Sequence, residues 1–131
     1  MFCETYNRKT FAAATGLDIT FVQDNQSTSK KGVLRGLHFQ KGAMAQAKLV
    51  RAIQGTILDV VVDLRKESAT FGQSFSITLT SENRKQLFVP RGFAHGFITL
   101  SETSTFGYKC DNYYGKASES GIIYNDETLA L

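Results

Sequence analysis

The chain has 131 residues, of which 42% are apolar and 21% charged, with 11 glycines, one proline, no tryptophan and a formal net charge of +3. This composition fits one globular domain, residues 1–131, and excludes collagen-like, coiled-coil and wholly disordered chains. Charged residues keep every apolar run well below the roughly 20 residues that a membrane span needs, and no basic segment followed by an apolar one opens the chain. We therefore expect a soluble protein that enters no membrane and carries no export signal.

One short helix is predicted near the N-terminus, followed by strands. Asn7 can cap a helix over residues 8–14, and Gly16 can adopt the left-handed conformation that ends it. Short strands separated by turn residues, without alternating helices, predict an antiparallel sandwich or barrel. The predicted strands cover residues 19–23, 33–40, 48–53, 57–64, 74–79, 86–89, 94–100 and 105–110.

Side-chain alternation places several polar residues on the apolar faces of these strands. Asp59 and Asp63 share a face with apolar neighbours, so both carboxylates need partners if that face is buried. Lys48 and Tyr108 also fall on predicted inward faces. A buried lysine is costly, which indicates a function for Lys48.

Basic residues are concentrated in one stretch of the chain. No Asp or Glu occurs between Asn25 and Leu58, whereas six basic residues do: Lys30, Lys31, Arg35, Lys41, Lys48 and Arg51. Such a stretch is either a solvated face or the lining of a pocket for an anionic small molecule, because guanidinium and ammonium groups bind phosphate. The small net charge gives no indication of nucleic-acid binding, and we expect none.

Neither the cysteines nor the histidines predict a metal site. Cys3 and Cys110 are far apart, without the spacing of a disulfide framework or a zinc site, which fits a reducing cytoplasm. His38 and His95 are the only histidines and lack the His-x-His pair with a nearby Glu that metal-binding barrels use. We expect no metal, and either histidine alone could be a hydrogen-bonded core residue.

Three residues have the side chains that acid–base chemistry requires. His38 can act as a neutral base, Tyr108 as an opposing proton donor, and Lys48 as a cation that stabilises an oxyanion. Tyr108 could equally be a core tyrosine whose hydroxyl bonds the backbone. Strict alternation puts Arg35 and His38 on opposite faces, so both reach one pocket only if the strand bulges at Gly36.

Longer motifs resemble those of one protein family. Their order and spacing are similar to the dTDP-4-dehydrorhamnose 3,5-epimerases over nearly the whole chain. The motifs are FVQDN at 21–25, GVLRGLHFQ at 32–40, KLVR at 48–51, DVVVDLR at 59–65, SEN at 81–83, PRGFAHGF at 90–97, and the segment from Tyr108 through Tyr114 to Asp126.

The resemblance implies a fold and a reaction. The fold is an all-β, cupin-type double-stranded β-helix, or jelly roll, with one short N-terminal helix, in a protein that is usually dimeric. The reaction epimerises dTDP-4-dehydro-6-deoxy-D-glucose at C3 and C5 to dTDP-4-dehydro-L-rhamnose, on the route to activated L-rhamnose and surface polysaccharide. It needs no cofactor and no metal, because the C4 ketone already makes the protons at C3 and C5 acidic.

The resemblance also implies a role for individual residues. His38 removes the proton, Tyr108 delivers one from the other side, and Lys48 steadies the enolate. Tyr114 stacks on the thymine, and the basic stretch binds the diphosphate. The implied substrate contacts are Glu4, Gln23, Asp24, Asn25, Arg35, His95, Tyr114 and Glu119.

Two segments of the family fall outside these 131 residues. Members usually begin earlier, with an Asp-x-Arg-Gly motif, and continue past Leu131 to an aspartate that hydrogen-bonds the catalytic histidine. Loss of the acid that orients a histidine slows related enzymes by about four orders of magnitude, so the alternative function is a catalytically weak sugar-nucleotide-binding relative. Asp59 or Asp63 is the candidate replacement for that acid. Uncovered sheet edges predict a dimer or a larger oligomer.

Overall fold

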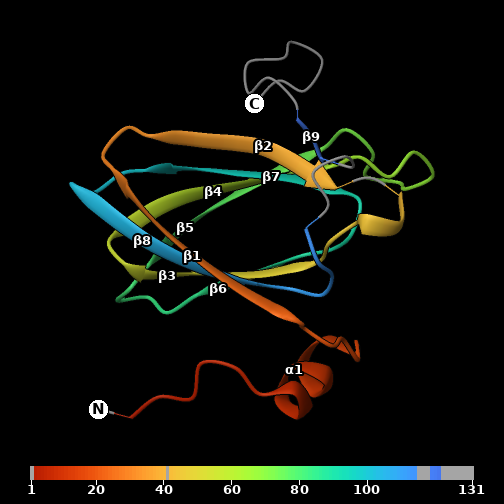
Figure 1. The fold of residues 1–131 in the computed structure, drawn as a ribbon, viewed down its shortest axis with the longest axis horizontal. Helices are drawn as coiled ribbons and strands as arrows, with labels where there is room; N and C mark the ends of the chain where they lie inside the picture. Colours follow the sequence, from red (N-terminus) through yellow and green to blue (C-terminus); the bar gives the residue numbers. More distant parts are fainter. Residues whose placement is uncertain (1, 41, 115–118, 122–131) are drawn as a thin grey trace.

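The computed structural model describes residues 2–40, 42–114 and 119–121, which form two antiparallel β-sheets facing each other (Figure 1). The chain passes repeatedly from one sheet to the other, which is the jelly-roll arrangement that was predicted. The four-stranded sheet has the order β1 (Gln23–Lys30), β8 (Thr103–Cys110), β3 (Lys48–Gln54) and β6 (Gln86–Val89). The five-stranded sheet has the order β5 (Ser74–Thr80), β4 (Thr56–Asp63), β7 (Phe93–Thr99), β2 (Leu34–Gln40) and β9 (Glu119–Gly121).

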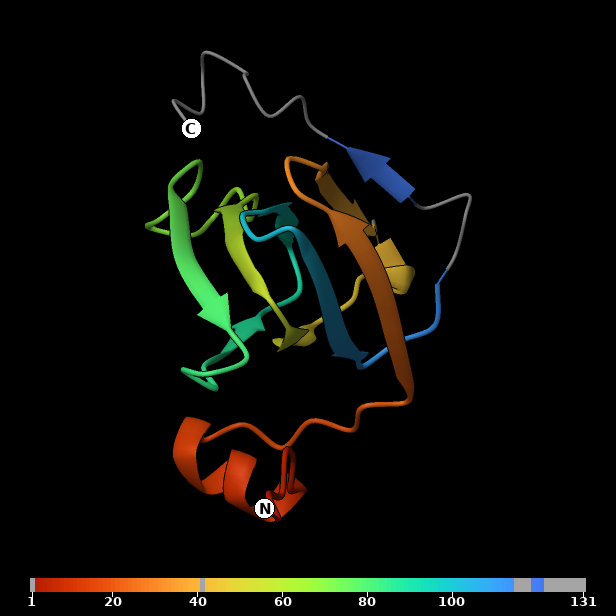
Figure 2. The ribbon, with the colours of Figure 1, turned by 90° about the vertical axis from the view of Figure 1, so that its left-hand side faces the viewer.

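The helix α1 (Arg8–Thr15) lies below one end of the sandwich, and β9 lies at the opposite end (Figure 2). The Asn7 side chain accepts hydrogen bonds from the first turn, and Gly16 ends the helix at φ 74°, as predicted. Phe11 packs on Phe88 of β6, with ring centroids 5.4 Å apart. Within the described residues, no helix has the length and hydropathy needed to cross a membrane.

Seven of the eight predicted strands are present, each within two residues of its predicted ends. The prediction of a strand over 19–23 is wrong, because β1 begins only at Gln23. The eight residues of β1 are all polar, so they carry no hydrophobic alternation to reveal the strand. Pairing with β8 along its whole length holds β1 in place. The three-residue strand β9 was also not predicted, and it pairs with the outer edge of β2.

The hydrophobic core lies between the inner faces of the two sheets. Its members come from both sheets, and Phe97 on β7 meets Phe106 on β8 with ring centroids 4.2 Å apart. The same two rings also line a cavity, so the core forms one wall of the candidate site. The buried cluster comprises Val50, Ala52, Ile57, Val61, Leu79, Val89, Phe97 and Phe106.

Candidate active site

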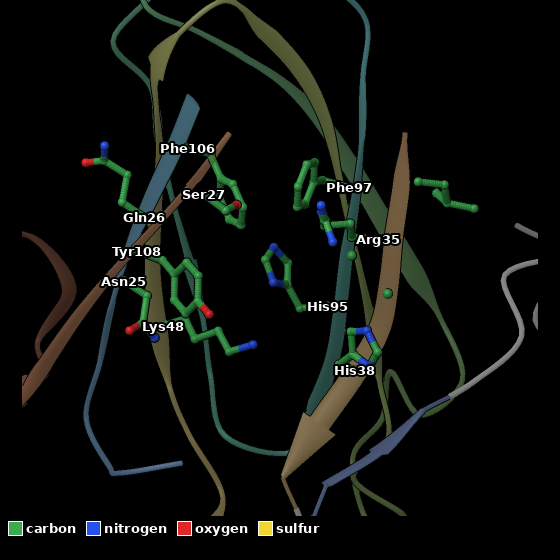
Figure 3. Close-up of a pocket in the computed structure, with 13 residues that line it drawn as sticks. Asn25, Gln26, Ser27, Arg35, His38, Lys48, His95, Phe97, Phe106 and Tyr108 are labelled. Carbon is green, nitrogen blue, oxygen red and sulfur yellow. The ribbon is translucent and has the colours of Figure 1, made fainter. Parts of the chain in front are cut away.

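A cavity of about 570 Å³ opens between the two sheets (Figure 3). Strands β1, β3 and β8 supply one wall, and β2 and β7 supply the other. Figure 3 shows Lys48 and Tyr108 on the first wall and His38 on the second. The three residues selected for acid–base chemistry therefore meet in one cavity, although they lie far apart in the sequence.

A bulge in β2 brings Arg35 and His38 to the same side of the sheet. The pairing of β2 with β7 shifts register between these two residues, as the shared pocket requires. Gly36 lies between them at φ 115°, and a Cβ there would sit 2.6 Å from the Cα of Gly96. Both Arg35 and His38 line the cavity. His38 is exposed, which rules out the interpretation of a buried core histidine.

Lys48 and Tyr108 lie on the neighbouring strands β3 and β8. The register pairs Tyr108 with Val50, which places Lys48 diagonally across from it on the same face. The Lys48 Nζ atom lies 5.3 Å from the centroid of the Tyr108 ring. A cation over this ring places positive charge next to the phenolic side chain and within the cavity.

Burial raises the pKa of the Tyr108 hydroxyl, and the neighbouring Asn25 side chain acts in the opposite direction. Burial dominates, because the phenolate loses more hydration than the neutral phenol. The hydroxyl consequently carries its proton at neutral pH. Tyr108 is in the state that a proton donor requires.

The two carboxylates on the inner face of β4 have partners, as their burial requires. The Nε2 atom of His95 lies 2.6 Å from Oδ1 of Asp59, whose side chain is fully buried. Asp63 accepts from Arg65 through Nε at 2.9 Å and Nη2 at 3.0 Å, and this pairing holds the pKa of Asp63 well below its usual range. The two candidate replacements for the acid partner of His38 are thus each paired with a different residue.

The basic stretch divides between the cavity and the outer surface. Arg35 and Lys48 line the cavity, where they provide fixed positive charge, and Arg35 also donates to the Ser29 hydroxyl at 3.2 Å. Lys30, at the end of β1, and Lys31, in the turn that follows, are exposed. Some basic residues of this stretch thus lie on a solvated face and others lie in a cavity, and binding of an anion there stays a prediction.

In the described part of the chain, no group of three or more His, Cys, Asp or Glu side chains is arranged to hold a metal ion. Cys110 is buried, and this burial raises the pKa of its thiol to about 11. A thiol at this pKa is neutral at pH 7 and is therefore a poor nucleophile and metal ligand.

The family model for dTDP-4-dehydrorhamnose 3,5-epimerase matches residues 1–131. The chain belongs to the dTDP-4-dehydrorhamnose 3,5-epimerase family. A Salmonella typhimurium protein of that name is 56% identical over 130 residues, which cover 99% of this chain and 71% of the relative. The Escherichia coli protein of the same name is 48% identical, with 99% and 70% covered.

Solved structures of this epimerase family share the fold. The dTDP-4-dehydrorhamnose 3,5-epimerase of Elizabethkingia anophelis superposes with a TM-score of 0.95 at 56% identity, covering 99% of this chain and 71% of that one. A dTDP-6-deoxy-D-glucose-3,5-epimerase of Legionella pneumophila, in complex with dTDP-4-keto-L-rhamnose, gives 0.95 at 47% identity, covering 99% and 69%. The cupin-type jelly roll predicted from the motifs is confirmed.

The structure of this family member brings some of the implied substrate contacts to the cavity. Arg35, His95 and Asn25 line it, and Gln23 hydrogen-bonds Asn25. Asp24 instead points outward, where it pairs with Lys109 at 2.9 Å.

Two other implied contacts, Glu4 and Tyr114, do not line the cavity. Glu4 lies near α1, beside two smaller surface pockets. Tyr114 is exposed beyond the end of β8. The backbone of Glu119 pairs with Gln40 in the sheet, but its side chain lies outside the described part of the structure. Their roles stay predictions.

Sequence reasoning missed several residues of the cavity. Ser27, Phe97 and Phe106 line it, and the Ser27 hydroxyl is buried without a hydrogen-bond partner. Alternation along β1 from Asn25 would have placed Ser27 on the inner face, had β1 been predicted. The pairing of Asp59 with His95 had no signal in the sequence beyond the need of Asp59 for a partner.

Proposed function

We propose that this chain is an isomerase that epimerises dTDP-4-dehydro-6-deoxy-D-glucose at C3 and C5 to dTDP-4-dehydro-L-rhamnose. This reaction supplies activated L-rhamnose for surface polysaccharide. The observation that carries the proposal is the convergence of His38, Lys48 and Tyr108 on one cavity. Family membership supports the substrate, because the curated relatives are named for this reaction.

In the proposed mechanism, His38 is the base and Lys48 stabilises the product of proton removal. A neutral imidazole takes the proton from a carbon next to the C4 ketone, and the electron pair moves onto the ketone oxygen. The Lys48 ammonium compensates the charge of that enolate oxygen. Its position across from His38 is consistent with this role, because substrate would lie between the two walls (Figure 3).

Tyr108 then delivers a proton to the opposite face of the same carbon. The new C–H bond forms as the enolate returns to the ketone, and the configuration is inverted. Two features support this assignment: the hydroxyl is protonated at neutral pH, and it lies on the wall facing β2. The same cycle at the second carbon completes the epimerisation.

Positive charge in the cavity supports binding of a sugar nucleotide. Arg35 lines the cavity from β2, and Lys48 lines it from β3. A guanidinium can bind two phosphate oxygens at once, so we assign Arg35 to the diphosphate. Gln23, Asp24, Asn25, Glu4, Glu119 and the thymine-stacking Tyr114 remain proposed contacts on the strength of the motifs.

We further propose that the protein acts in the cytoplasm as a homodimer. The cysteine pattern is consistent with a reducing compartment. Apolar side chains that are partly or fully exposed on the outer face of the five-stranded sheet are consistent with a subunit interface. Leu34, Leu58, Val60 and Ile98 line a shallow groove there.

Solvent deuterium tests the reaction. The protein is incubated with the keto sugar nucleotide in D2O, and deuterium is located by NMR and mass spectrometry. We expect incorporation at both C3 and C5 together with the inverted product, and a loss of at least about 100-fold in His38→Asn. Thr28→Val is the matched control, because Thr28 faces outward on β1.

Absence of exchange with the intact protein would contradict this function. Calorimetry with thymidine diphosphate then separates two outcomes. Binding without exchange supports the alternative of a catalytically weak sugar-nucleotide-binding relative. Absence of binding excludes both the epimerase and this alternative.

A further inference from the structure

Asn25 and Tyr108 face each other directly across two paired strands. The register of β1 and β8 places them opposite one another, so their side chains project from the same face of the sheet. Both line the cavity, and Figure 3 shows them next to each other on the wall formed by β1, β3 and β8. The Asn25 side chain also lowers the pKa of the Tyr108 hydroxyl, which is consistent with this proximity.

Gln23 fixes the direction of the Asn25 amide. Gln23 lies two residues earlier on β1 and faces the same side, and its Nε2 donates to Asn25 Oδ1 at 2.9 Å. With its oxygen occupied, Asn25 presents its NH₂ group to its other neighbours. One neighbour is the thiol of Cys110, with 4.0 Å between Nδ2 and Sγ, and the other is Tyr108.

Burial of Tyr108 disfavours a negative charge on its oxygen. Burial raises the pKa of the hydroxyl, and Cys110 adds to that increase at the high pH at which its thiol ionises. The Asn25 side chain acts in the opposite direction and lowers the pKa of Tyr108. The charged and titratable groups that share the cavity with it are Lys48 from β3, His95 from β7, and Arg35 and His38 from β2.

We propose that Asn25 is a positioning residue for the acid of this reaction, and that Gln23 orients it. The Asn25 amide donates to the Tyr108 oxygen and stabilises the phenolate that forms when Tyr108 gives its proton to the substrate. This inference rests on the proposed function, and it differs from the role of substrate contact that the family motifs imply for Asn25.

The proton transfer balances within the cavity. The Tyr108 O–H bond breaks, its proton forms the C–H bond of the product, and the electron pair stays on the phenolic oxygen. The enolate electron pair forms the new C–H bond as the C4 ketone is restored. Water later returns a proton to the phenolate, and the imidazolium of His38 gives its proton to solvent.

A titration of the free protein tests the contact without any substrate. Tyrosine labelled with ¹³C at Cζ reports ionisation of each ring by NMR, and Tyr108→Phe identifies the signal. We expect Asn25→Leu to raise the Tyr108 midpoint by about one pH unit, because a donor to the phenolate is lost. Asn25→Asp should raise it at least as far, and Gln23→Leu by less. An unchanged or lowered midpoint in Asn25→Leu overturns the proposal.

A product ratio tests the same contact during turnover. In D2O, the ratio of inverted product to substrate that has exchanged without inversion measures how often Tyr108 delivers its proton after His38 has acted. We expect Asn25→Leu to lower this ratio about tenfold. If Asn25 only binds substrate, exchange and inversion fall together, the ratio stays constant, and the proposal is wrong. Thr28→Val should change neither quantity.

The two experiments separate this proposal from the proposed function. If the intact protein shows no deuterium exchange, the proposed epimerase function is wrong. The titration then still shows whether Asn25 acts on the Tyr108 hydroxyl. If Tyr108→Phe leaves the ratio unchanged, Tyr108 is not the acid, and the role of Asn25 falls with it. Should Asn25→Leu fail to fold, Gln23→Leu gives the same readouts with smaller shifts in the same directions.

Discussion

The pair formed by Asp59 and His95 is almost entirely removed from solvent, with 0% and 6% of the side chains exposed. Replacing one member leaves the other with its desolvation cost uncompensated. We expect His95→Leu to lower the free energy of unfolding by about 3 kcal/mol, measured by urea denaturation at pH 7. Asp59→Leu and the double variant complete a thermodynamic cycle.

The double variant should be markedly more stable than the sum of the two single effects predicts, because it leaves no charge buried alone. Additive effects within about 0.5 kcal/mol would show that the two side chains do not stabilise each other.

Asp63 gives a pH-dependent contribution whose sign follows from its pKa. Arg65 holds the pKa of the folded-state carboxylate below its unfolded value, so the pairing stabilises the fold above the unfolded pKa of about 4. As pH falls from about 4 toward the folded pKa, this advantage declines. We expect Asp63→Asn to be clearly less stable than the parent chain at pH 7 and pH 5, and the gap to narrow at pH 3. Urea unfolding at pH 7, 5 and 3 measures this difference in unfolding free energy. A difference that is larger at pH 3 than at pH 7 would contradict the pairing of Asp63 with Arg65.

At the scale of elements, the contact between β2 and β7 depends on two facing glycines. A Cβ on Gly36 would meet the Cα of Gly96 at 2.6 Å, and one on Gly96 would meet the carbonyl oxygen of Arg35 at 2.6 Å. The neighbours are backbone atoms, which cannot rotate away. The same contact carries the bulge that turns both Arg35 and His38 toward the cavity.

We expect Gly36→Ala to destabilise the protein and to reduce deuterium exchange, because the two strands must separate. Gly32→Ala is the control: Gly32 also has positive φ, but a Cβ there meets nothing within 4 Å. Backbone strain affects both variants, so the steric contact should make Gly36→Ala worse by about 1–3 kcal/mol in thermal or urea unfolding. Equal losses of unfolding free energy in the two variants would show that the close approach of Gly36 to Gly96 does not affect stability.

The elements that the sequence predicted well are those with one apolar face. Strand β5 alternates strictly, and it was found to within one residue. Strand β1 was missed because its inner face lines a polar cavity and its outer face meets solvent, so neither face requires apolar residues. A strand that lines a polar cavity therefore lacks the hydrophobic alternation by which strands are predicted.

At the scale of the whole molecule, the exposed apolar residues bear on assembly. Phe2, Phe71 and Phe75 are more than half exposed, and an apolar groove crosses the outer face of the five-stranded sheet. Burying such surface between subunits is favourable. We expect light scattering after size exclusion to give at least twice the 14.5 kDa mass of one chain. A single monomeric peak would contradict the homodimer.

Alternation and motif order are local or linear properties, so they were enough to predict the jelly roll, the short helix and the catalytic candidates His38, Lys48 and Tyr108. The sequence also showed that Asp59 and Asp63 need partners. The folded structure was needed to identify those partners and to show that Asn25 faces Tyr108 while Asp24 faces solvent. Those contacts depend on strand register and on which strands lie side by side, and residues far apart in the chain carry no local signal of either.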